Sequence, residues 1–147
     1  MIRGYFATSA AHRRPFVNAH FDFPSLGLAG DIPLLVDTGA DPTVLAPADA
    51  GRLEIPLAQL PSGPPSAGVG GTTLTVSVPA TLTLDARSVA VTMRILTPQT
   101  PRQQRTLRRI PSLLGRDILS RFALFMEERS QRVLLLEPHE ADALSLT

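Results

Sequence analysis

The stretch Leu34-Leu35-Val36-Asp37-Thr38-Gly39-Ala40-Asp41 decides how this chain is interpreted. A short apolar run, typical of a buried strand, is followed directly by a carboxylate, a hydroxyl and a glycine. An ionised carboxylate beside an apolar run is costly unless it is paired or hydrogen-bonded. A glycine two residues later permits a tight turn that brings backbone N–H groups toward it. Alone, the triplet also fits an ordinary strand end, because Asp and Gly are common turn formers.

Two further stretches of the sequence help to decide whether the triplet is more than an ordinary strand end. Pro64 to Gly71 holds three glycines in four residues around one valine and precedes an alternating strand, which is typical of a mobile β-hairpin. The run Leu113-Leu114-Gly115-Arg116-Asp117-Ile118-Leu119 places two leucines and a glycine directly before the best helix candidate, Arg116 to Phe122.

Periodicity predicts a mostly β protein. Alternating polar and apolar residues predict half-buried strands, and continuous apolar runs predict strands buried on both faces. The alternating segments are 15–23, 73–84 and 89–95, and the continuous runs are 34–36 and 133–136. The 14 prolines argue against long helices, so only a short helix at 47–53 is expected besides the one at Arg116. We expect the proline- and arginine-rich segment 97–112 to be a long surface loop.

Composition excludes several classes of protein. A length of 147 residues with 44% hydrophobic residues indicates one globular domain, residues 1–147, with a core of about 16–136. The absence of cysteine rules out disulfide scaffolds, thiolate metal sites and cysteine nucleophiles. With only His12, His20 and His139, we expect no metal and no cofactor. The apolar residues are too interrupted for a membrane span or a signal peptide, so a cytoplasmic protein is expected.

Charge is nearly balanced overall, at +1, but the arginines are unevenly spread. From Ala86 to Arg116 there are seven arginines and no acidic residue. No Phe, Tyr or Trp lies between Phe23 and Phe122, so this region lacks the aromatic platforms on which bases stack. We therefore expect no nucleic-acid partner. A solvated loop is favoured, with recognition of an acidic substrate or partner as the alternative.

The order Leu-Val-Asp-Thr-Gly-Ala-Asp, Gly-Val-Gly-Gly and Leu-Leu-Gly-Arg-Asp-Ile-Leu resembles the retropepsin-like aspartic proteases. The resemblance extends from about Phe16 to Leu136, nearly the whole chain. It implies an all-β, single-domain closed fold, half of a pepsin-like enzyme, with one short helix in the C-terminal half. It also implies a homodimer that hydrolyses peptide bonds.

The resemblance implies roles for the residues of the first stretch. Asp37 would be the catalytic aspartate, and Thr38 would hydrogen-bond across to the partner chain. Gly39 would supply backbone contacts to the substrate, and Asp41 would contact the substrate main chain nearer its ends. Arg116 would pair with Asp41 and brace the loop.

The same family resemblance assigns the hairpin and one leucine to substrate binding. Gly68, Val69, Gly70 and Gly71 would form the flap that closes over the peptide. Leu113 would line a specificity pocket.

Peptide hydrolysis by this chemistry needs two carboxylates, one ionised to accept a proton from water and one protonated to donate to the carbonyl. Asp37 is the only aspartate followed by Thr-Gly or Ser-Gly, so a symmetric dimer would supply the second copy. If the monomer were active, Asp117 would be the first candidate for the second acid. The rival function is a dimerisation or peptide-binding module with weak or no proteolysis, because fold alone does not fix function.

Overall fold

The computed structural model describes residues 1–68 and 71–146, and strands dominate it. The strands are β1 (Ile2–Arg3), β2 (Tyr5–Ser9), β3 (His12–Phe23), β4 (Leu28–Val36), β5 (Val44–Leu45), β6 (Ser66–Gly68), β7 (Gly71–Leu84), β8 (Arg87–Thr97), β9 (Leu113–Leu114), β10 (Ala123–Glu127) and β11 (Arg132–Leu136). The predicted strands are all present, and β3, β4, β7 and β8 are longer than periodicity indicated.

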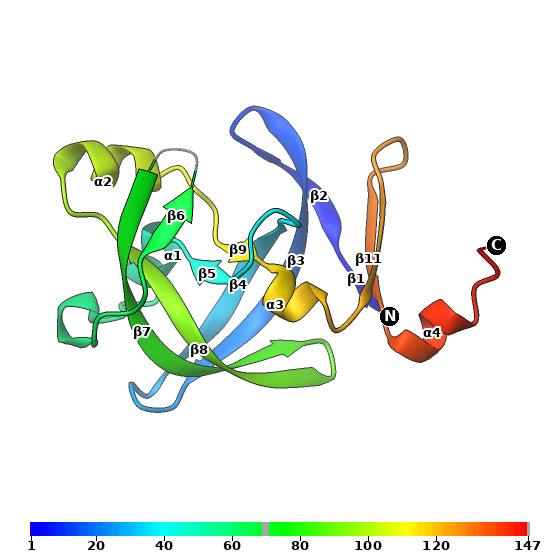
Figure 1. Cartoon of the computed structure of the whole chain (residues 1–147), viewed down its shortest axis with the longest axis horizontal. Helices are drawn as coiled ribbons and strands as arrows, with labels where there is room; N and C mark the ends of the chain where they lie inside the picture. The colour runs from blue at the N-terminus through cyan, green and yellow to red at the C-terminus, as the bar shows by residue number, and fades with distance from the viewer. Residues whose placement is uncertain (69–70, 147) are drawn as a thin grey trace.

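The main sheet closes on itself, as expected for the fold class. Its strand order is β2-β3-β4-β9-β5-β8-β7-β6, and a further pairing of β3 with β7 joins distant members of that order. The closing register places Phe21 opposite Leu82, and both side chains are fully buried. Figure 1 shows the long β7–β8 hairpin curving across β3 and β4 to complete this arrangement.

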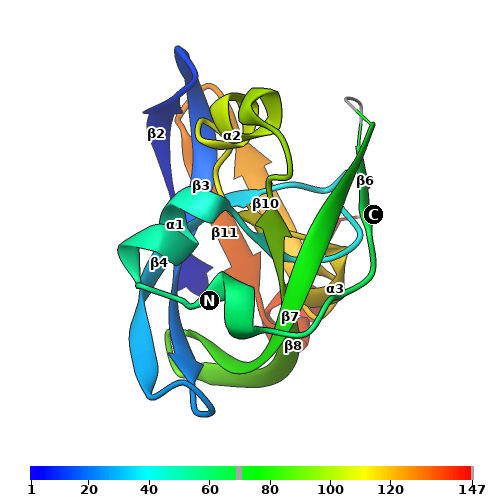
Figure 2. The same cartoon turned by 90° about the vertical axis from the view of Figure 1, so that its left-hand side faces the viewer.

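The helices are short and peripheral: α1 (Pro47–Arg52), the 3-10 turn η1 (Leu57–Gln59), α2 (Pro101–Leu107), α3 (Arg116–Leu119) and α4 (Pro138–Asp142). Helix α2 corrects the expectation of a loop through 97–112. Thr100 caps it by accepting a hydrogen bond from the Gln103 N–H, and Pro101 occupies the first turn, where proline is tolerated. Figure 1 shows α2 at the end of the molecule away from α4, and Figure 2, which views that end, shows it in front of the sheet.

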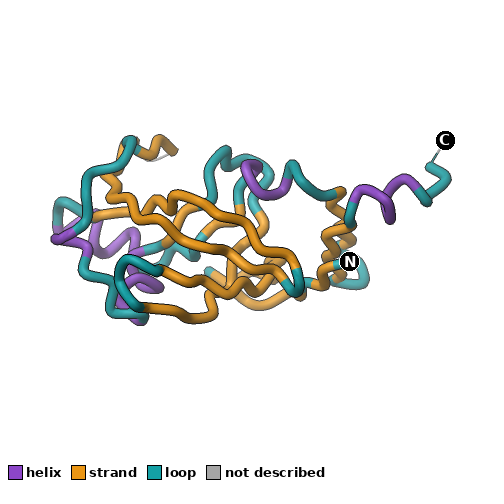
Figure 3. The backbone as a smooth tube through the Cα atoms, turned by 90° about the horizontal axis from the view of Figure 1, so that it is seen from below, coloured by secondary structure: helices purple, strands orange, loops and turns teal. Residues whose placement is uncertain are grey.

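A second, smaller sheet gathers the two ends of the chain, in the order β1-β11-β10. β11 lies in the middle, with Ile2 opposite Leu135 and Phe125 opposite Leu134. Figure 3 shows the N-terminus beside this sheet and α4 extending beyond it. No helix in the described part of the chain has the length and apolar character needed to cross a membrane.

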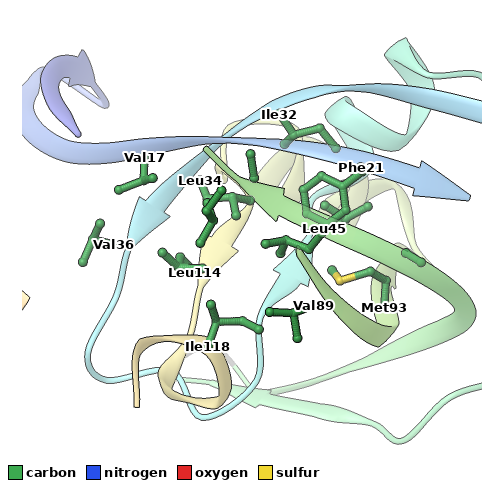
Figure 4. Packing of buried hydrophobic residues seen from close by; sticks show 14 of the residues in the cluster. Val17, Phe21, Ile32, Leu34, Val36, Leu45, Val89, Met93, Leu114 and Ile118 are labelled. Atoms are coloured by element: carbon green, nitrogen blue, oxygen red, sulfur yellow. The ribbon is translucent and has the colours of Figure 1, made fainter. Parts of the chain in front are cut away.

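The core lies inside the closed sheet and extends directly under the Asp-Thr-Gly turn. Leu34, Leu114 and Ile118 are at most 1% exposed, and Val36 is 9% exposed. Figure 4 shows these four side chains packed together where β4, β9 and α3 meet. Burial of such residues supplies most of the stabilisation of a fold, so the site rests on its most rigid part.

Candidate active site

The backbone around Asp37 lies where β9 is inserted between β4 and β5. β9 pairs with β4 in parallel on one side, through Leu35–Leu113 and Val36–Leu114, and with β5 on its other side. The chain therefore leaves β4, passes around the end of β9 and returns as β5. The loop that makes this passage, residues 37–43, carries the predicted catalytic residues.

Asp37 is held at the start of this loop by backbone contacts. Its N–H donates to the Leu114 carbonyl at 3.1 Å, which continues the β4–β9 ladder by one residue. Its carboxylate Oδ1 accepts from the Gly39 N–H at 2.9 Å, and its carbonyl accepts from the Ala40 N–H at 3.2 Å. A Cβ at Gly39 would lie 3.3 Å from this carboxylate oxygen, so glycine allows the close turn.

The two residues after Asp37 face solvent in a single chain. Thr38 and Gly39 are both exposed, whereas Asp37 is half-buried. The Thr38 hydroxyl forms no hydrogen bond with any described residue of its own chain. The tip of the loop is thus available for contact with another molecule.

Arg116 contributes to the loop mainly through its backbone. Its N–H donates to the Ala40 carbonyl at 2.8 Å, and the next N–H, of Asp117, donates to the Asp41 carbonyl at 3.0 Å. The guanidinium lies 3.8 Å from the Asp41 carboxylate, with the two side chains 67% and 90% exposed. Such an exposed pair contributes little to stability, so the predicted bracing is carried chiefly by the two backbone bonds.

Asp117 and Thr43 form a polar connection that sequence reasoning did not assign. Asp117 Oδ1 accepts three hydrogen bonds: from the Thr43 N–H at 3.0 Å, the Thr43 hydroxyl at 2.7 Å and the Ile118 N–H at 2.8 Å. The hydroxyl also accepts from the Gly115 N–H at 3.0 Å, and Thr43 is only 3% exposed. This carboxylate is therefore committed to holding the loop, which argues against Asp117 as a second catalytic acid.

Gly115 allows the two halves of the site to touch. A Cβ at this position would lie 2.4 Å from the Pro42 carbonyl oxygen and 2.9 Å from the Thr43 nitrogen. Any side chain would force α3 away from the loop. The glycine that precedes α3 is thus explained by this close contact with the loop.

Ser112, just before β9, connects this strand to helix α1 through a buried hydroxyl. Its hydroxyl is fully buried, accepts from the Ala46 N–H at 2.9 Å and donates to the Asp49 carboxylate at 2.6 Å. This pair fixes α1 against the strand that precedes Leu113. Leu113 itself is partly buried and lies opposite both Leu35 and Val44.

The expected flap is a hairpin at the end of β6 and β7, with Gly68 opposite Gly71. Gly71 has a φ of +112°, a conformation that favours glycine. The other two predicted flap residues, Val69 and Gly70, lie outside the described residues. The base of the hairpin is held by the Thr75 hydroxyl, which donates to the Pro64 carbonyl at 2.6 Å.

Within residues 1–68 and 71–146, no three histidine, cysteine or acidic side chains come together as a set of metal ligands. The hydrogen-bonding groups at the tip of the loop are a half-buried carboxylate, exposed backbone groups and an exposed hydroxyl. Such an arrangement suits proton transfer to and from a bound peptide and its attacking water.

The sequence matches no family model and no curated protein, but the structure resembles known proteases. The protease of EIAV, solved with the inhibitor HBY-793, superposes with a TM-score of 0.53 and 27% identity, covering 78% of this chain and 92% of that one. A retropepsin-like aspartic protease from Rickettsia conorii superposes with a TM-score of 0.57 and 17% identity, covering 92% and 91%. The chain has the retropepsin-like fold, and its structural neighbours are aspartic proteases.

Proposed function

We propose that the chain is an aspartic endopeptidase whose active form is a homodimer with one Asp37 from each copy. The observation that carries this proposal is the loop 37–43, where one Asp-Thr-Gly turn is held against β9 and leaves Thr38 exposed. The structural neighbours of the chain include the EIAV protease, solved with an inhibitor bound. The chain supplies one such turn, so the second must come from a second copy.

The two carboxylates would act as one unit. Like charges about 3 Å apart resist joint ionisation, so the pair shares a proton and titrates as a dyad. The ionised member takes a proton from water as the oxygen attacks the peptide carbonyl, while the protonated member donates to the carbonyl oxygen. Gly39 and Gly68 would bind the peptide main chain, and the same role is proposed for Val69 and Gly70. Leu113 would line a side-chain pocket, and Asp41 would contact the peptide farther out.

The terminal sheet supports the assignment of a second copy as partner. β10 is an edge strand of this sheet, and no second strand lies along its outer side in the described structure. Phe125 and Met126 on it are 40% and 46% exposed. An open strand edge with exposed large apolar side chains is suited to pairing with another chain.

Catalysis is tested by replacing Asp37 with asparagine, which keeps the shape of the side chain but cannot exchange a proton. Cleavage of a mixed peptide library should be abolished while the circular-dichroism melting curve is unchanged. Asp85→Asn is the matched control, because Asp85 is exposed and its φ of 50° is one that asparagine tolerates. Full activity of Asp37→Asn would contradict the proposal, and peptide binding without cleavage by the unmodified protein would favour a non-catalytic module.

The dimer requirement is tested by dilution and by mixing. Specific activity should fall as sedimentation shows the dimer dissociating, because mass action governs an obligate dimer. Excess Asp37→Asn chains should poison the unmodified chains once subunits exchange, since a heterodimer keeps only one ionisable aspartate of the pair. A monomer with full activity at every concentration would overturn this part of the proposal.

A further inference from the structure

The function proposed above leaves helix α2 and its arginines unused. Arg102, Arg105, Arg108 and Arg109 are all exposed. None of the four forms an ion pair with a carboxylate in the described structure, whereas Arg52, Arg87, Arg129 and Arg132 elsewhere each do. These four unpaired side chains are called the α2 arginines below.

Two of the α2 arginines lie on one side of the helix and two follow its end. Arg102 and Arg105 are one turn apart on α2, while Arg108 is the C-terminal cap residue and Arg109 comes directly after it. Leu107, the buried residue of α2, projects from the opposite side and is 6% exposed. Arg105, Thr106, Arg108 and Arg109 line a shallow depression in the surface. The helix therefore buries one side and presents a nearly continuous cationic side to solvent.

Both ends of α2 are connected to the candidate active site. The segment that enters it follows Thr97, which pairs with Leu74 of the flap strand β7. The segment that leaves it becomes β9, where Leu113 pairs with Leu35 just before Asp37. Figure 1 shows the chain running from α2 into β9, which lies next to the loop between β4 and β5.

Like charges at spacings of three and four residues destabilise a helix. Arg105 follows Arg102 at such a spacing within α2, and the first turn of α2 contains no acidic residue to offset the pair. A negatively charged ligand beside the helix would relieve this repulsion. Among anionic macromolecules, a peptide fits better than a nucleic acid, because the segment after α2 leads into β9 of the proposed peptide-binding site and residues 24–121 contain no aromatic side chain on which bases could stack.

We infer that the α2 arginines extend the substrate site, so that the enzyme prefers peptides whose apolar cleaved segment is flanked by glutamate or aspartate. This inference rests on the proposed proteolysis. In a two-fold symmetric dimer one α2 lies toward each end of the site, so acidic residues on both sides of the cleaved bond are favoured.

The test compares two synthetic peptides with the same apolar centre, one flanked by glutamates and one by glutamines. At low ionic strength the acidic peptide should have a kcat/KM about tenfold higher, as expected for two or three exposed ion pairs. The preference should shrink at high salt, because exposed charges are screened. It should also be lost in Arg105→Gln/Arg109→Gln. The matched control, Arg121→Gln/Arg129→Gln, removes the same charge from exposed positions outside α2 and should keep the preference.

Binding measurements separate this inference from the proposed proteolysis. Fluorescence anisotropy of labelled peptides with Asp37→Asn protein reports affinity without cleavage, and sedimentation confirms that each variant still forms the same oligomer. If neither peptide is cleaved but the acidic one binds tighter through the α2 arginines, proteolysis fails and the recognition surface stands. Equal affinity for both peptides, or tighter binding of a single-stranded oligonucleotide than of the acidic peptide, would overturn the inference.

Discussion

Thr43→Val is the substitution that most directly tests how the loop 37–43 is held. Valine has the shape of threonine but lacks the hydroxyl that joins Gly115 N–H to the Asp117 carboxylate. Losing a hydrogen bond to a charged group and leaving a buried N–H without a partner together cost about 3 kcal/mol. In a chain of this size that lowers the melting temperature by about 10 °C.

The assay combines thermal unfolding with peptide cleavage measured well below the melting temperature. Thr43→Val should lose kcat as well as stability, because Asp117 keeps only its two backbone donors and the loop carrying Asp37 loses its anchor to Gly115. Thr92→Val is the matched control on an exposed strand position and should change stability by less than about 0.5 kcal/mol. Equal melting temperatures for the two variants would refute the reasoning.

Three further predictions concern other parts of the chain. Gly115→Ala should destabilise the protein by about 3 kcal/mol and abolish cleavage, because the new methyl group meets the Pro42 carbonyl; calorimetry showing an unchanged melting temperature would contradict this. Replacing Ala10-Ala11 by Asn-Gly should stabilise the β2–β3 hairpin by about 1 kcal/mol, since both alanines have positive φ, and a lower denaturation midpoint would count against it. Hydrogen bonds from Ser130 and from two arginines lower the pKa of Glu127 to about 2. The contribution of Glu127 to the stability of the β10–β11 turn should therefore be complete above about pH 4.5 and be lost only as the pH falls toward 2. An NMR titration of Glu127 with a midpoint near 4.5 would contradict this.

Periodicity and local motifs predicted most of the fold. The two-residue alternation located the long strands, and the Asp37 and Gly115 stretches located the loop and the helix start that meet at the site. Local signals could not reveal the contact of Thr43 with Asp117, because these residues are 74 positions apart and meet only when β5 and α3 pack. An acidic residue in the first turn of a helix was the one available hint.

Two other features were missed for different reasons. Helix α2 was expected to be a loop because prolines and arginines dominate its segment, although Thr100 and Pro101 form a recognisable helix start. The terminal sheet was missed because β1 spans only two residues, too few to show any period. Its partner β11 was predicted as a strand, but pairing across more than 130 positions leaves no trace in local sequence.

The pairing of β1 with β11 has a consequence for control of the enzyme we propose. Both ends of the chain are already engaged within one copy, so separation of a dimer leaves each half with its terminal sheet intact. Folding and activation are then distinct events. A dilute chain would remain folded as an inactive half-enzyme, and anything that concentrates it, such as a scaffold or a shared compartment, would start its activity.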